Sequence, residues 1–267
     1  MRFFTAVFGR EHLRAGVALT RTFSRYNTTP LTVFTDQPGW FEHEKEANFA
    51  ELATEYPSFY NQEGGRRNVF KYALTRRMQE SFPGESVCWI DADMLVFDDL
   101  TQHLSDGHIN VIAHGRRSES MNCGGGLRVP GEMYAISGLF ALPPGPALGI
   151  LETVTRERPH WEDDGSPNHN IGDQLILNHL LARTEVPVHW LTDDRRYIYN
   201  LEVADGLHPA PGDPALKRVR WHRRPVLDGR RIVVFYWIKS KLDRHLQDEF
   251  CSFRPSVARR LMRLYSL

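Results

Sequence analysis

Cysteine is scarce in this sequence, and the few cysteines are far apart. Cys88, Cys123 and Cys251 are the only three in 267 residues, and no two of them form a Cys-x-x-Cys pair. An odd number of widely spaced cysteines indicates neither a disulfide framework nor a structural zinc site. A reducing compartment fits this pattern, and we therefore expect a cytoplasmic protein.

An excess of one charge and a long hydrophobic run are also missing. Lys and Arg together number 33, as do Asp and Glu, so no overall field draws the chain to nucleic acid or anionic lipid. No stretch approaches the roughly 20 apolar residues of a membrane span, and the apolar run at residues 3–8 is too short for a signal peptide. We expect no nucleic-acid partner and no integral membrane segment, and the oligomeric state stays open.

The composition that is present is that of an ordinary globular protein. Hydrophobic residues make up 41% and charged residues 25% of the chain, and no internal repeat or low-complexity linker divides it. We therefore predict a single domain over residues 1–267, whose segment 251–267 is a C-terminal helix. The alternation of Arg with apolar residues at 256–267 fits a helix docked on the domain, which we favour over an amphipathic helix at a membrane surface.

Strands and helices alternate in the first hundred residues. Apolar runs predict strands at 3–8, 31–34 and 87–90, and apolar residues at helical spacing predict helices at 12–26 and 69–82. Strand–helix–strand units of this length are built on parallel strands. We therefore predict an α/β fold whose sheet begins parallel.

The order of elements is less regular after residue 110. Apolar runs predict strands at 111–113, 135–142 and 231–237, and helical spacing predicts helices at 148–157 and 173–182. A glycine-rich loop separates the first two of these strands. These elements complete one α/β domain.

Two acidic residues follow the predicted strand 87–90. Side chains two apart on a strand point to the same side, so Asp91 and Asp93 are expected to present two carboxylates together where the strand ends. Ligands of open α/β sheets bind beyond the carboxyl ends of the strands. A hard cation such as Mg²⁺ or Mn²⁺ would offset the repulsion between the two carboxylates. The competing interpretation is that both are turn residues that cap the next element.

The residues around this pair resemble a known family. Residues 87–100 resemble the DxD region of GT-A glycosyltransferases, especially the glycogenin-like and lipopolysaccharide galactosyltransferase-like enzymes. Further matches follow in order: residues 136–140 resemble an Asn-Ser/Ala-Gly-Val-Phe strand, 172–178 an Asp-Gln-x-x-Leu-Asn helix start, and 233–241 lie where relatives carry His-Phe-x-Gly-x-x-Lys. The resemblance implies a Rossmann-like GT-A fold with a mixed, mainly parallel sheet. It also implies a nucleotide-binding half at 1–110 and an acceptor and sugar half at 111–250.

The resemblance implies a role for particular residues. Asp91 and Asp93 would bind Mn²⁺ or Mg²⁺, and Asp173 and Gln174 would lie beside the reacting sugar. The other implied donor contacts are to the base and ribose (Val7, Phe8, Asp36), to the diphosphate (Lys71, Lys241) and to the sugar (Ser137, Gly138). Asp173 also fits the N-terminal cap of its helix, and Lys71 also fits a solvated helix residue.

The sequence departs from the family pattern at two of these segments. Ile136 replaces the usual Asn, and Phe235 replaces the His that relatives use as a third protein ligand of the metal. His222, His245 or the diphosphate itself could supply that ligand. The polar residues His160, Asp163, Asp164 and His169 fit no zinc spacing, and we interpret them as an acceptor-facing loop.

The resemblance implies transfer of a hexose from a nucleoside diphosphate sugar to a hydroxyl of a glycan or small molecule. We expect the donor to be a UDP-sugar. The reaction would retain anomeric configuration and depend on the metal. Two alternatives remain: a haloacid-dehalogenase-like phosphohydrolase, which also carries DxD after a strand, and a non-catalytic protein that binds sugar nucleotides.

Overall fold

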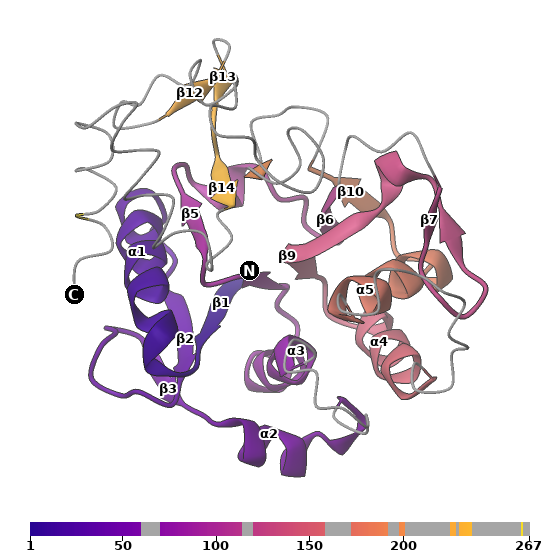
Figure 1. Ribbon diagram of the computed structural model, residues 1–267, viewed down its shortest axis with the longest axis horizontal. Coiled ribbons are helices and arrows are strands. Elements are labelled where there is room, and N and C mark those ends of the chain that lie inside the picture. Colours follow the sequence, from indigo (N-terminus) through magenta and orange to yellow (C-terminus); the bar gives the residue numbers. More distant parts are fainter. Residues whose placement is uncertain are drawn as a thin grey trace. The chain divides into compact units, whose positions relative to one another are not determined.

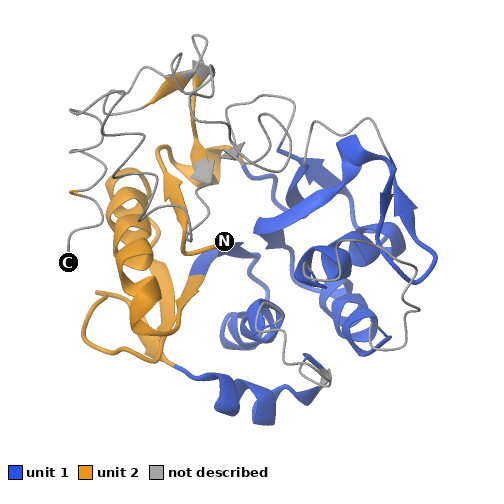
Figure 2. Cartoon of the chain, in the orientation of Figure 1, with its two compact units in different colours: residues 1–4, 47–90, 104–191 blue, residues 5–46, 91–103, 192–267 orange. Residues whose placement is uncertain are grey.

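The computed structural model describes residues 1–59, 70–113, 120–157, 172–191, 198–200, 225–227, 230–236 and 263. Seven strands form one hydrogen-bonded sheet in the order β10-β6-β9-β4-β1-β2-β3 (Figure 1). The residues group into two compact units that alternate along the chain (Figure 2). Unit 1 comprises residues 1–4, 47–90 and 104–191, and unit 2 comprises residues 5–46, 91–103 and 192–267.

Unit 1 is built around the longest strand, β9 (Ala135–Leu142), whose eight residues are all buried. It pairs antiparallel with β4 (Val87–Ile90) on one side and with β6 (Ile109–Ala113) on the other. β4 pairs parallel with the first residues of β1 (Arg2–Val7), and β6 pairs parallel with β10 (Val188–Trp190). A strand with neighbours on both edges and buried faces has no polar side to present, which accounts for the continuous apolar run of β9.

The helices of unit 1 are α2 (Phe49–Glu55), α3 (Phe70–Ser81), α4 (Pro146–Glu157) and α5 (Gly172–Arg183). α4 and α5 lie side by side, and α5 also packs on β9 (Figure 1). The hairpin of β7 (Met121–Asn122) and β8 (Arg128–Val129) packs near α5 through a cluster of Met121, Cys123, Tyr134 and Leu175. Short 3-10 helices occur at η1 (Pro57–Phe59) and η4 (Gly131–Met133).

Unit 2 contains the long helix α1 (Arg10–Tyr26), followed by β2 (Leu31–Thr35) and β3 (Glu44–Glu46). A second small sheet has the order β11-β14-β5, formed by β11 (Ile198–Asn200), β14 (Val234–Tyr236) and β5 (Met94–Val96). The 3-10 helix η3 (Leu100–Gln102) and the hairpin of β12 (Val226–Leu227) and β13 (Arg230–Arg231) complete the described elements.

The predicted elements agree with the observed ones, apart from one strand. The observed sheet is mixed, mainly parallel and flanked by helices, which confirms the predicted α/β class. The strand predicted at 231–237 is confirmed at 234–236, where β14 pairs with β5 and β11, but its start differs, because Arg231 belongs to β13. No pattern in the sequence predicts the short strands β3, β5, β7, β8, β10, β11 and β12, because two or three residues are too few to show a period.

No helix among the described residues combines the length and the apolar character needed to cross a membrane. The predicted division near residue 110 is not tested by the structure, and the C-terminal helix predicted for 251–267 lies outside the described residues apart from Arg263.

Candidate functional site

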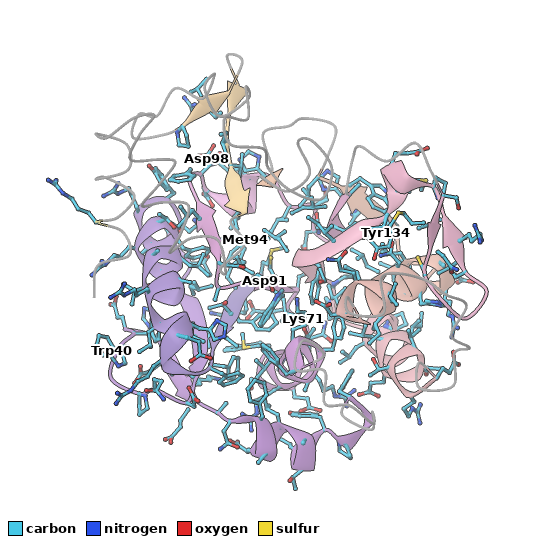
Figure 3. All side chains as sticks on the ribbon, viewed as in Figure 1. Trp40, Lys71, Asp91, Met94, Asp98 and Tyr134 are labelled. Atoms are coloured by element: carbon cyan, nitrogen blue, oxygen red, sulfur yellow. The ribbon has the colours of Figure 1, made fainter. Side chains whose placement is uncertain are left out.

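Three residues predicted to contact the donor meet inside unit 1. Lys71 projects from α3 (Figure 3), Ser137 is the third residue of β9, and Asp173 is in the first turn of α5. The Lys71 Nζ lies 2.8 Å from Asp173 Oδ2, and the Ser137 hydroxyl donates to the same oxygen over 2.5 Å. Lys71, Ser137 and Asp173 are 3%, 2% and 5% exposed. The structure therefore joins three elements through one buried carboxylate.

The ion pair fixes the charge of Asp173. Burial alone would raise the pKa of this carboxyl, but the Lys71 ammonium and the hydrogen bonds from Lys71 and Ser137 outweigh it, so the pKa lies below its ordinary value. The α5 N-terminus adds a positive dipole on the same side. Asp173 is therefore a carboxylate at neutral pH although it is almost fully withdrawn from water.

The second oxygen of this carboxylate is the unusual atom of the cluster. Asp173 Oδ1 is buried and accepts no hydrogen bond within the described part of the chain. A buried charged acceptor without a donor costs free energy, so such atoms call for a structural or functional explanation. A ligand hydroxyl would satisfy it.

Lys71 is held by the protein on several sides. Its Nζ donates to the Ser137 carbonyl over 3.2 Å and lies 5.4 Å from the centre of the Trp89 ring. The interpretation of Lys71 as a solvated helix residue is therefore wrong. The ammonium lies where it stabilises the charge of Asp173.

Two residues that the sequence reasoning did not assign to a site also hold Asp173 and its helix. The Tyr72 hydroxyl donates to the Asp173 carbonyl, and the Asn178 amide bonds the peptide of Ala135 at the start of β9. No sequence pattern indicated a role for Tyr72, which is simply an aromatic residue next to Lys71. Asn178 was part of the segment that resembles the family, but its helical position gave no hint of its partner.

The remaining predicted residues of unit 1 flank this cluster. Gln174 follows Asp173 in α5, is partly exposed, and accepts a hydrogen bond from the Asn178 amide through its carbonyl, 2.8 Å away. Gly138 follows Ser137 in β9 and is buried. Gln174 is therefore the member of this group that has a side chain partly open to solvent.

The predicted base and ribose residues lie together in unit 2. Val7 and Phe8 are buried at the end of β1, and the Val7 carbonyl accepts a hydrogen bond from the Thr35 hydroxyl over 2.8 Å. Asp36 is exposed and accepts the Gly9 N–H over 2.9 Å through Oδ1. Gly9 has φ 80°, a left-handed conformation that favours glycine at this turn into α1. The carboxyl ends of β1 and β2 are thus connected by these two hydrogen bonds.

Asp91 and Asp93 lie in a turn, which corrects the prediction that they extend the strand. β4 ends at Ile90, and the Met94 N–H donates to the Asp91 carbonyl over 3.1 Å, which closes the turn before β5. The strand rule that residues two apart face the same side therefore does not apply here. Both side chains are partly exposed, and Figure 3 marks Asp91 and Met94.

The chemistry of this turn suits a hard divalent ion. Two carboxylates supply oxygen ligands, and Mg²⁺ or Mn²⁺ commonly takes one or two protein carboxylates and completes its shell with water and phosphate. No group of three His, Cys, Asp or Glu that could hold a metal ion occurs among the residues that are described. Asp91 and Asp93 are therefore the candidate oxygen ligands that this turn offers among the described residues.

The segment expected to hold the third ligand lies in the same unit. In β14, Phe235 pairs with Leu95 and Tyr236 with Met94, so this segment runs beside the strand that follows Asp93. The phosphate-binding Lys241, the alternative ligands His222 and His245, and the predicted acceptor loop with His160, Asp163, Asp164 and His169 lie outside the described residues.

No protein-family model and no curated protein matches the chain. Its class is set by solved structures: the chain has a glycosyltransferase fold of the GT-A type. An active-site mutant of LgtC is 13% identical over 99% of this chain and 95% of its own, with a TM-score of 0.53. A glycosyltransferase involved in the glycosylation of the major capsid of PBCV-1 is 10% identical over 92% of this chain and 100% of its own, with a TM-score of 0.50.

A third solved structure is the galactosyltransferase LgtC with donor and acceptor sugar analogues, 14% identical over 99% of this chain and 95% of its own, with a TM-score of 0.49. At these identities the two comparisons with the higher scores establish the fold alone. What the chain does is therefore argued below from its own residues.

Proposed function

We propose that this chain is an enzyme that transfers a hexose from a nucleoside diphosphate sugar, UDP-linked, to a hydroxyl of a glycan or small molecule. The observation that carries the proposal is Asp173. Its carboxylate is buried and charged, Lys71 and Ser137 hold one oxygen, and the other oxygen has no donor within the described residues. A sugar hydroxyl is a neutral donor of the right strength for such an oxygen. The glycosyltransferase fold supports the same function.

The charge of Asp173 also suits the reaction. As the bond to the leaving diphosphate lengthens, positive charge develops on the anomeric carbon and ring oxygen of the sugar, and a fixed carboxylate stabilises it. Lys71 keeps this carboxylate ionised, and Ser137 fixes its orientation. Gln174 is proposed to face the same sugar, in a reaction that retains anomeric configuration.

The donor nucleotide and its ion are assigned to unit 2. Val7, Phe8 and Asp36 are proposed to contact the base and ribose, and Asp91 and Asp93 to hold Mn²⁺ or Mg²⁺. When bound, the ion neutralises charge on the departing diphosphate. Lys241 is proposed to bind the same phosphates, and Ser137 and Gly138 to line the sugar.

The test uses purified protein with Mn²⁺ and a panel of UDP-sugars, and it measures released UDP with and without simple glycan acceptors. We expect slow release of UDP from one donor even without acceptor. D173N and D93N should each lower the rate at least about 100-fold, since each removes an electrostatic contribution of about 3 kcal/mol.

The matched control is D106N. Asp106 is an exposed acid of unit 1 whose carboxylate accepts the Ser86 hydroxyl over 3.0 Å, an interaction that Asn preserves. Its rate should stay within about twofold of wild type, because exposed substitutions of this kind change little. Donor binding without turnover would instead indicate the non-catalytic sugar-nucleotide protein. No binding of any sugar nucleotide would end the proposal.

A further inference from the structure

Asn178 is a buried amide of α5 that makes three hydrogen bonds, and two of them go to one peptide of another element. Its Oδ1 accepts the Ala135 N–H and its Nδ2 donates to the Ala135 carbonyl, both over 2.9 Å. The same Nδ2 donates to the Gln174 carbonyl over 2.8 Å. The amide is 1% exposed, so no water competes for these bonds. The side chain thus satisfies both the N–H and the carbonyl of Ala135, as a neighbouring strand would do.

These bonds close a ring of contacts that contains Asp173. Ala135 is two residues before Ser137 on β9, and Ser137 donates to Asp173, which lies on α5 five positions before Asn178. The ring therefore runs from Asn178 to β9, along the strand to Ser137, across to Asp173 and back along the helix. The two contacts between the elements, Asn178–Ala135 and Ser137–Asp173, fix the position of α5 along β9.

We infer that Asn178 is a positioning residue for Asp173: its amide sets the register between α5 and β9 and so keeps the carboxylate oriented, with Oδ2 on Lys71 and Ser137 and with no donor to Oδ1 among the described residues. The inference rests on the proposed function for its catalytic consequence. Its structural part stands without it, because the ring of contacts exists in the protein alone. A displacement of about 1 Å at a reacting group can cost roughly 100-fold in rate.

The chain offers a matched control in Asn110. This amide on β6 is 0% exposed, and it bonds one peptide in a similar way: Oδ1 accepts the Ser105 N–H over 2.7 Å, and Nδ2 donates to the Ser105 carbonyl over 2.9 Å and to the His108 carbonyl over 3.0 Å. Its Oδ1 also lies 2.9 Å from His189 Nδ1, a contact without a counterpart at Asn178 among the residues described. Both amides belong to unit 1. Ser105, His108 and His189, which these bonds join to Asn110, are not part of the ring that holds Asp173.

The experiment compares N178D and N110D in the full-length protein. Each substitution keeps the shape and replaces a donor to two carbonyls by a carboxylate oxygen that repels them. Both should lower stability, measured as the urea midpoint. We expect N178D alone to lower kcat of donor hydrolysis, by about 10–100-fold with KM changed less than about threefold.

The pH profile separates positioning from a general loss of stability. Burial beside two carbonyls raises the pKa of the new carboxyl in N178D, and its protonated form regains a donor. The ratio of its kcat to that of wild type should therefore rise as pH falls from about 8 to about 5. N110D should show no such recovery.

A crystal structure of N178D decides the structural part directly. We expect the Ser137–Asp173 contact to lengthen or break, whereas in N110D it should stay as in wild type. If N178D fails to fold, N178S serves in its place. An unchanged Ser137–Asp173 contact, or equal losses of kcat in the two variants, would overturn the inference. A wild-type protein without turnover would refute the proposed function and leave the crystallographic test of Asn178 intact.

Discussion

The Lys71 ammonium and the Asp173 carboxylate form an ion pair that is almost wholly withdrawn from water. Bringing two charges into the interior costs free energy that their attraction only partly repays, so the pair is weak evidence for a role in stability. Its retention is better explained by what it does for Asp173. The ammonium keeps a buried carboxylate charged.

A double-mutant cycle on this pair tests that account. K71M should lower the free energy of unfolding by about 3–5 kcal/mol, because it leaves a buried carboxylate without its counter-charge. D173N should also destabilise, since it leaves the ammonium. The double variant K71M/D173N should be less destabilised than the sum of the single changes by roughly 1–3 kcal/mol, as measured by urea denaturation of the four proteins. Additive effects would show that the two charges do not stabilise each other.

His179 is a second buried titratable residue, and it gives stability a dependence on pH. Its Nε2 lies 3.0 Å from the Gly124 carbonyl and 3.3 Å from the Cys123 carbonyl. Because carbonyl oxygens only accept, the neutral imidazole has its hydrogen on Nε2 and donates to the glycine-rich turn between β7 and β8. Burial lowers the pKa of this imidazole below its ordinary value. The unfolded chain therefore binds the proton more readily, and stability falls as pH drops below about 6.5.

Replacing His179 by Gln removes this dependence and keeps a donor. Between pH 7 and pH 5 the free energy of unfolding should fall less in H179Q than in wild type, by up to about 1.4 kcal/mol for each unit of pKa shift. Denaturant titrations at several pH values measure this difference. Parallel curves would contradict the assignment, because the two proteins differ only at residue 179.

At the scale of elements, replacement of a helix glycine by alanine should have opposite effects on stability at two positions. A Cβ on Gly16 of α1 would lie 2.4 Å from Val7 Cγ2, so this glycine allows the helix to approach β1 closely. A Cβ on Gly149 of α4 would meet nothing within 4 Å. Both glycines lie in helices, where Ala is the more favourable residue by roughly 1 kcal/mol.

We therefore expect G149A to raise the free energy of unfolding by about 0.5–1 kcal/mol and G16A to lower it by about 1–3 kcal/mol. Thermal unfolding followed by circular dichroism measures both variants. A gain in stability from G16A would show that α1 is not packed on β1 as closely as described.

The elements also show how far the sequence predicts this fold. Helix α1 and strand β9 each carry a period or an apolar run over many residues, and their boundaries were predicted closely. Asp91 was placed on a strand and lies in a turn, because the apolar residues on both sides of it hide the reversal between β4 and β5. β3 was not predicted, since its Glu44-Lys45-Glu46 sequence has no apolar residue and it forms only through pairing with β2.

At the scale of the whole molecule, ligand binding should couple to folding. On the proposed function, a donor nucleotide with its ion would bind only the folded chain, so at 100 times its dissociation constant it should add about 2.7 kcal/mol of stability. UDP with Mn²⁺ is therefore expected to raise Tm by roughly 5–10 °C. UDP with EDTA should raise it less, and D93N should show the same smaller rise with or without Mn²⁺. Equal rises for wild type with and without the ion would remove the metal from the proposal.

By itself, the sequence determined the alternation of strands and helices and the acidic pair after β4, because these depend on residues that are neighbours along the chain. It also carried Ser137 and Asp173 as candidates through their local resemblance to a family. Only the tertiary structure decided that these two residues share a hydrogen bond. It also decided that Lys71, 66 residues before Ser137, pairs with the Asp173 carboxylate and keeps it ionised. The bonds from Asn178 to a strand 43 residues away were likewise decided by the packing. Contacts at such separations depend on how whole elements pack, and no local pattern encodes which side chains will meet.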